Sequence, residues 1–293
     1  MREQLVGYAT GCASVALQES FDYYGDIKAI YGLISREVSL AEVLSDSGID
    51  RGVKVDLVND LFAGSVSKAA LGTLVQIVTL EEPDSIVDSL AYISRMSEQD
   101  VLPSTGAQVT AARVRYFARA IFDLLESEEK IAEVEHRLLD FRTLLEENKR
   151  LSRILSGVGS SPAIREEIVS DLFGAGSSTV ERSFILIVKY MVVAGRIRDL
   201  LQLVDKVVAL ASELRRTRIA EIRVAESLDS ERLDRISATL SALCGYSVET
   251  REVIDSHLLG GVLAIVGDTI YDGSVRHRLD LIRGRMSVAA VGK

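Results

Sequence analysis

Residues 260–283 read GGVLAIVGDTIYDGSVRHRLDLIR, and their turn and strand signals decide how the end of the chain folds. Gly260 and Gly261 permit a positive φ or a close backbone approach just before an apolar strand over 262–266. Gly267-Asp268 predicts a turn into a second short strand. Asp272-Gly273-Ser274 then predicts a turn, with the aspartate or the serine as N-cap of a closing helix.

The sequence upstream of this run alternates between strand and helix patterns. Apolar and polar residues alternate over 217–226 and 247–254, as in strands, and a helical period fills 230–244. With the closing helix over 274–285, the order becomes β-α-β-β-β-α. We therefore expect a small α+β domain over residues 213–293.

The preceding part of the chain, residues 107–212, carries the period of amphipathic helices. Apolar side chains recur at spacings of three and four residues over 114–125 and 131–145. Ser178 and Glu181 form a capping box before a strongly apolar helix. Six helices, packed as one bundle, are expected over 114–125, 131–145, 151–155, 162–173, 180–193 and 197–214.

The first third of the chain repeats this module. A shift of 111 residues places Asp60-Leu61-Phe62 on Asp171-Leu172-Phe173, and a shift of 108 places residues 8–17 on 116–125. Its helices are expected over 4–17, 23–36, 40–46, 54–62, 68–80 and 84–96, before a linker over 103–106 that is rich in helix breakers. The sequence thus predicts a mainly α fold: two tandem six-helix bundles, 1–106 and 107–212, followed by the α+β domain.

The net charge of −9 belongs entirely to the first of these parts. Residues 1–106 hold 7 Lys and Arg against 16 Asp and Glu, whereas residues 107–212 hold 15 of each sign and residues 213–293 hold 12 of each. This change in composition supports a domain boundary near residue 106. An acidic total also argues against a nucleic-acid-binding protein.

Membrane and secretion signals are weak in this sequence. No apolar run reaches the roughly 18 residues that a membrane span needs, and Lys189 interrupts one of the longest runs. The first residues, Met-Arg-Glu-Gln, do not begin a signal peptide. Cys12 and Cys244 lie far apart in apolar stretches, which favours two reduced thiols in the cytoplasm over a disulfide.

The sequence predicts no catalytic, cofactor or metal site. Gly174-Ala175-Gly176-Ser177 has the start of a dinucleotide loop, but it follows a helix and lacks the third glycine. The three histidines are His136, His257 and His277. Asp255-Ser256-His257 contains the residue types of a catalytic triad, but adjacency in sequence is not the geometry of a triad, and a turn is the simpler interpretation.

The stretch over residues 260–283 resembles the signature of the δ subunit of F-type ATP synthases, the family of the mitochondrial oligomycin-sensitivity-conferring protein. That pattern is Gly-Gly, an apolar strand, Gly-Asp, an apolar residue, then Asp-Gly-Ser-apolar-Arg-x-Arg-Leu. The matching residues are Gly260, Gly261, Gly267, Asp268, Ile270, Asp272, Gly273, Ser274, Val275, Arg276, Arg278 and Leu279.

The resemblance extends upstream and covers about residues 108–286. Residues 115–122 are similar to the opening helix of the family, and Gly195-Arg196-Ile197 stands where its last bundle helix begins. Departures are Phe117 in place of the usual Tyr, Ser256 where Pro is common, and His277 where a small residue is typical. Residues 1–106 resemble an added copy of the N-terminal bundle, as in longer δ chains of some bacteria.

The resemblance implies a non-catalytic stator subunit, present in one copy per complex, peripheral to the cytoplasmic face of the cell membrane. It implies that the helical domain binds α subunits of the catalytic head and that the C-terminal domain binds b subunits of the peripheral stalk. The two contacts together would resist rotor torque during proton-driven ATP synthesis. A groove between helices 114–125 and 180–193 would take an α-subunit helix. Candidate contacts there are Phe117, Arg119, Ala120 and Val192.

Two other interpretations remain open from the sequence. One is a tandem helical-bundle scaffold or regulatory adaptor unrelated to ATP synthase, which explains the repeat but not the C-terminal signature. The other is an enzyme that holds a metal at acidic helix ends. We also expect the acidic residues Glu81, Glu82, Asp84 and Asp88 to form a solvated or electrostatically steered face that meets basic parts of the stalk.

Overall fold

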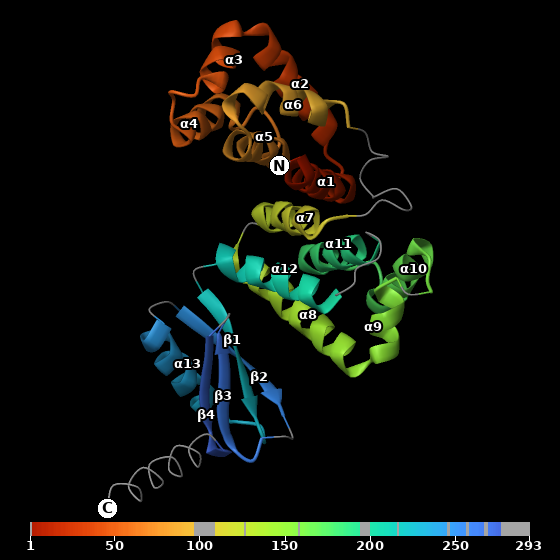
Figure 1. Cartoon of the computed structure of the whole chain (residues 1–293), viewed down its shortest axis with the longest axis vertical. Coiled ribbons are helices and arrows are strands. Elements are labelled where there is room, and N and C mark those ends of the chain that lie inside the picture. The colour runs from red at the N-terminus through yellow and green to blue at the C-terminus, as the bar shows by residue number, and fades with distance from the viewer. Residues whose placement is uncertain are drawn as a thin grey trace, which may run out of the picture. The chain divides into compact units, whose positions relative to one another are not determined.

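The computed structural model describes residues 2–96, 109–125, 127–157, 159–193, 200–215, 217–244, 247–255, 258–266 and 269–276. The chain divides into two compact units, Met1–Ala211 and Ser212–Lys293. The first unit is built of helices and the second of a four-stranded sheet with a helix (Figure 1). The described chain is therefore mainly helical with a small sheet near its C-terminal end, as the sequence predicts.

The predicted helices of the first third are confirmed at nearly their expected positions. They are α1 (Arg2–Glu19), α2 (Tyr23–Arg36), α3 (Val38–Ser45), α4 (Arg51–Phe62), α5 (Lys68–Leu80), the short 3-10 helix η1 (Pro83–Ser85) and α6 (Ile86–Ser94). Side-chain oxygens of Asp22, Asp50 and Ser67 accept backbone N–H bonds at the starts of α2, α4 and α5. Local capping thus fixes where three of these helices begin.

The next six helices follow the predicted order. They are α7 (Ala111–Leu124), α8 (Glu128–Glu147), α9 (Lys149–Leu155), α10 (Pro162–Phe173), α11 (Thr179–Val193) and α12 (Leu200–Leu214). Phe117 of α7 stacks on Tyr190 of α11 with the ring centroids 3.7 Å apart. Phe141, Phe173 and Phe184 meet edge to face and join α8, α10 and α11.

The capping box at the start of α11 is confirmed. The Glu181 N–H donates to Ser178 Oγ at 3.1 Å, and Glu181 Oε2 accepts from the Ser178 N–H at 3.3 Å. The same oxygen also accepts from the Ser177 N–H and hydroxyl at 2.8 and 2.6 Å. These hydrogen bonds lower the pKa of Glu181 to about 2.

Glu181 should therefore make stability depend on pH in the acid range. A carboxylate whose pKa is depressed in the folded state stabilises it above the ordinary value of 4.5, and this contribution disappears as the pH falls toward 2. We expect Glu181→Gln to lower the midpoint of thermal unfolding at pH 6 but not near pH 2. The exposed Glu167 gives a matched control, Glu167→Gln. An equal effect of Glu181→Gln at both pH values would show that its charge plays no part.

The helices of the first third share part of their core with the helices that follow. Residues 1–211 form one compact unit, and the core of the first third includes Ala120 of α7. The predicted division into two six-helix bundles is therefore not confirmed, and the boundary expected at residue 106 lies outside the described residues. Within the described ranges, no helix has the length and apolar character of a membrane span.

The C-terminal unit confirms the predicted order β-α-β-β-β. Its elements are β1 (Thr217–Val224), α13 (Ser230–Cys244), β2 (Ser247–Ile254), β3 (Gly261–Val266) and β4 (Thr269–Ser274). The sheet order is β2-β1-β3-β4, with β1 parallel to β2 and antiparallel to β3. Alternate residues of β1 and β3 form the core with Leu240 of α13; on the strands they are Ala220, Ile222, Val224, Ala264 and Val266.

One expectation for this unit is wrong. Asp272-Gly273-Ser274 is not a turn but the end of β4, because its backbone pairs with the start of β3 in the register Val262↔Gly273 and Gly261↔Ser274. Asp272 Oδ1 still accepts a hydrogen bond from the Ser274 N–H at 2.9 Å. The predicted closing helix beyond Arg276 lies outside the described residues.

Candidate functional site

Helix α7 is buried on two faces rather than one. One buried face of α7 is the apolar stripe that the sequence predicts, and it includes Val114, Phe117 and Ile121. On other positions of the same helix, Tyr116, Ala120 and Leu124 pack into the core of the first third. Helix α1 lies directly against α7 (Figure 1). The first third therefore covers a helix face that would otherwise be a free surface.

Two glycines of α1 allow this close approach. A Cβ atom on Gly11 would lie 2.6 Å from the carbonyl oxygen of Phe117 and 2.8 Å from the Cβ of Ala120. A Cβ atom on Gly7 would overlap the carbonyl oxygen of Arg113. The backbones of α1 and α7 are thus in direct contact, and no larger side chain fits between them.

A polar contact accompanies this packing. The Tyr8 hydroxyl donates to Asp123 Oδ2 at 3.0 Å, and Arg119 Nε lies 3.5 Å from the same oxygen. Burial raises the pKa of Asp123, and it also raises the pKa of Tyr8 well above its ordinary value. At neutral pH Tyr8 therefore stays protonated, which makes it a hydrogen-bond donor to the partly exposed carboxylate of Asp123.

Three of the four residues expected to contact an α subunit lie inside the chain. Phe117 is 1% exposed, and Ala120 and Val192 are 0% exposed. The side chain of Arg119 is 36% exposed. The sequence interpretation missed the pairing of α1 with α7, although the spacing of Tyr116, Ala120 and Leu124 was a signal for a second buried face.

The C-terminal unit contains an apolar groove between α13 and the β3–β4 side of the sheet. Its volume is about 480 Å³. It is lined by Arg235, Ile236, Thr239, Leu240, Val262, Ala264, Tyr271, Asp272 and Gly273. Gly273 pairs with Val262 across the sheet and brings no side chain to the groove. Such a channel, apolar along its floor and charged at Arg235 and Asp272, suits an amphipathic helix.

The signature residues lie beside this groove or support its strands. Gly261 has a φ of +83°, and a Cβ atom there would lie 2.6 Å from the carbonyl oxygen of Gly273. Gly260 has a φ of +136°, and its carbonyl accepts from the Val275 N–H at 3.0 Å. Ser274 is buried and Arg276 is exposed. Four further signature residues, Gly267, Asp268, Arg278 and Leu279, lie outside the described residues.

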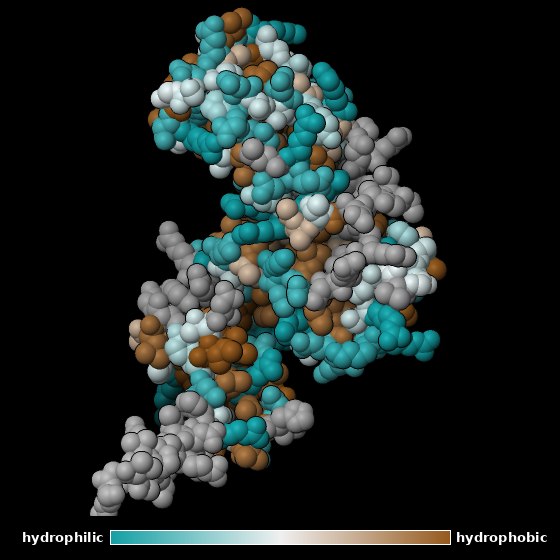
Figure 2. All heavy atoms as spheres, in the orientation of Figure 1, coloured by the Kyte–Doolittle hydropathy of each residue, from teal (hydrophilic) through white to brown (hydrophobic). Residues whose placement is uncertain are grey.

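Exposed hydrophobic side chains are frequent in the same unit. Their exposed fractions run from 40% for Val275 to 74% for Leu259. The others are Leu243, Ile254 and Ile270. Figure 2 shows hydrophobic side chains at the surface beside α13. Exposed apolar residues gathered in one small unit are typical of a surface that binds a protein partner.

Comparison with known proteins now decides between the open interpretations. The family model "ATP synthase delta (OSCP) subunit" matches residues 114–286. The chain belongs to this family. It is thus a stator subunit of an F-type ATP synthase, and an unrelated scaffold or adaptor is not favoured.

Relatives named ATP synthase subunit delta occur in two lengths. The one from Desulforudis audaxviator is 30% identical over 184 residues, which are 62% of this chain and 98% of that relative. The one from Streptomyces avermitilis is 26% identical over 89% of this chain and 87% of its own length. The one from Salinispora tropica is 24% identical over 97% of this chain and 94% of its own length. The δ chain described here therefore has nearly the length of the last two relatives, and it is longer than the first by more than half of that relative's length.

Proposed function

We propose that this δ subunit is a non-catalytic link between the catalytic head and the peripheral stalk. Its helical unit binds the N-terminal helices of α subunits, and its C-terminal unit binds b subunits. One copy in each complex, on the cytoplasmic face of the membrane, holds the head against rotor torque. The observation that carries this proposal is the apolar groove between α13 and the sheet, bordered by the signature residues Asp272 and Gly273.

The groove fits the stalk half of the proposal by its shape and chemistry. A helix of a b subunit would lay its apolar side on Ile236, Val262 and Tyr271, as amphipathic helices do in grooves of this kind. Arg235 and Asp272 at the edge offer charges of both signs to the polar side of that helix. The exposed apolar residues of the same unit offer further area for contact with a partner.

For the contact with the α subunits of the catalytic head, we propose Arg119, because its side chain is partly accessible. Phe117, Ala120 and Val192 are buried, so they would shape the helices that carry the contact rather than touch the α subunit themselves. Since α1 covers one face of α7, an α-subunit helix would bind beside α1 rather than on that face.

A bulky residue in the groove should break the stalk contact selectively. Thr239 lines the groove at an exposed position of α13, and Ala238 is its exposed neighbour outside the groove lining. We expect Thr239→Trp to weaken binding of the b subunits at least about tenfold, roughly 1.4 kcal/mol, whereas Ala238→Trp leaves it unchanged. Pull-down of b and α subunits measures both contacts.

Truncation tests more coarsely whether the two units bind different partners. Removal of residues 213–293 should abolish b-subunit binding while α-subunit binding survives. If both partners were lost, or neither, the assignment of one partner to each unit would be wrong.

A further inference from the structure

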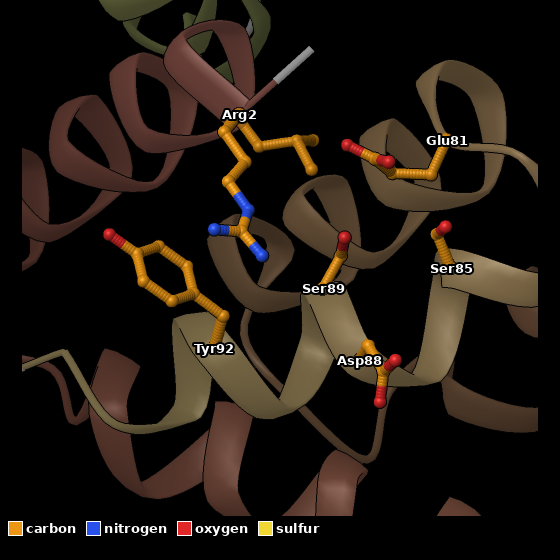
Figure 3. Close-up of a pocket in the computed structure, with 7 residues that line it drawn as sticks. Arg2, Glu81, Ser85, Asp88, Ser89 and Tyr92 are labelled. Carbon is orange, nitrogen blue, oxygen red and sulfur yellow. The ribbon is translucent and has the colours of Figure 1, made fainter.

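A small cavity lies in the first third of the helical unit, beside the start of α1 and along α6 (Figure 3). Its volume is about 130 Å³, which accommodates one small charged group. It is lined by Arg2, Leu5, Glu81, Ser85, Asp88, Ser89 and Tyr92. Two of the lining residues, Glu81 and Asp88, belong to the acidic set that the sequence places on a solvated face.

The carboxylate of Glu81 is buried, contrary to that expectation. Glu81 is 6% exposed, and among the described residues its Oε1 atom has no hydrogen-bond partner. Figure 3 shows the carboxylate directed into the cavity. Glu81 is also the C-cap residue of α5, where the helix dipole adds negative potential. Burial of a carboxylate is unfavourable unless other groups compensate it, and a bound cation would do so.

Two arginines lie close to this region, but both interact with other groups. Arg51 donates to the backbone carbonyls of Thr79 and Glu81, at 3.1 and 3.4 Å, and so neutralises the end of α5. The guanidinium of Arg2 lies over the ring of Tyr92, 5.5 Å from its centroid (Figure 3). The side-chain oxygen Oε1 of Glu81 is left facing the cavity.

The other lining groups also favour a cation. Ser85, which ends η1 and precedes α6, is followed at helical spacing by Ser89 and Tyr92 of α6, and Figure 3 shows the Ser89 hydroxyl turned toward the cavity. Asp88 is exposed at the edge. Two carboxylates against one guanidinium give the lining a net charge of −1. One monovalent cation would balance it.

We propose that this cavity binds the ammonium group of a lysine side chain from a partner subunit, an inference that rests on the proposed function for the source of that lysine. An ammonium group has three N–H donors, and Glu81 with the two serine hydroxyls supplies acceptors for them. The charge of the surrounding domain attracts a basic partner, since residues 1–106 hold 16 acidic against 7 basic side chains.

The first test uses the isolated full chain and n-butylammonium chloride as the probe. In the unmodified chain and in Glu82→Gln, we expect saturable shifts of the Ser85 and Ser89 amide signals in NMR spectra. In Glu81→Gln the dissociation constant should rise about tenfold. Glu82 is the exposed neighbour of Glu81, so both variants lose one charge at adjacent positions. Shifts that match those of sodium chloride in all three proteins would overturn the site.

The second test asks whether the natural ligand belongs to a partner. We expect the assembled complex to release Glu81→Gln at a lower salt concentration than it releases the unmodified chain or Glu82→Gln. The isolated Glu81→Gln chain should be at least as stable to heat, because it loses a buried charge whose Oε1 atom has no hydrogen-bond partner among the described residues. If the chain binds the butylammonium probe but Glu81→Gln leaves the complex at the same salt concentration as the unmodified chain, the ligand is not a lysine of a partner. A free amine would then be the ligand. Failure of the unmodified chain to join the complex would contradict the proposed function instead.

Discussion

Gly11→Leu should lower the free energy of unfolding of the helical unit by about 3 kcal/mol. Even a single added carbon on Gly11 meets the Phe117 carbonyl and the Ala120 side chain at less than 3 Å. Leucine can fit only if α1 moves away from α7, which exposes Ala120 and disturbs the hydrogen bond between Tyr8 and Asp123. Urea unfolding followed by circular dichroism measures the change.

Gly32→Leu is the matched control. Gly32 also lies within a helix, but nothing stands within 4 Å of a Cβ atom there. Leucine is the better helix former by roughly 0.8 kcal/mol, so this variant should be as stable as the parent or more so. If Gly11→Leu behaved like Gly32→Leu, α1 and α7 would not be in backbone contact.

The contact between α1 and α7 also explains how the long form differs from the short relative. The Desulforudis relative is matched over 98% of its length by 62% of this chain, so about a third of the chain has no counterpart there. In the long chain Tyr116, Ala120 and Leu124 are covered by the first third. The added helices thus share a core with α7 and are not attached by a linker alone.

Local signals explain why the helices could be predicted and this contact could not. Ser67, Ser178 and Pro162 act on their own backbone, so the starts of α5, α11 and α10 follow from a few neighbouring residues. Gly7 and Gly11 give no such local signal. Within a helical pattern, a glycine only lowers the helix propensity of its own segment. Their role appears once α7, more than a hundred residues later, is packed against them.

Long-range packing also explains two expectations that the structure overturns. Asp272-Gly273-Ser274 has the composition of a turn, yet pairing with β3 holds it in the strand β4. Glu81 stands in an acidic run that reads as solvated, yet it lies between α5, α6 and the start of α1 and is buried. In both cases packing or pairing with another element overrides the local preference.

The second large effect is expected at Gly261, which begins β3. Gly261→Ala should destabilise the C-terminal unit by about 3 kcal/mol, because two costs add. The φ of +83° is strained for any residue with a Cβ atom, and that atom would also lie 2.6 Å from the Gly273 carbonyl and 2.8 Å from Ser274 Cα. The β3–β4 pairing would open, and the groove lined by Val262 and Gly273 would lose its shape.

Gly64→Ala separates these two costs. Gly64 has a φ of +78° with nothing within 4 Å of a Cβ atom, so only the backbone strain of roughly 1 kcal/mol applies. Thermal unfolding measures both variants, and binding of the b subunits should fall only in Gly261→Ala. Equal losses of stability in the two variants would mean that glycine is needed at position 261 for its positive φ alone. The groove would then not depend on close contact between β3 and β4.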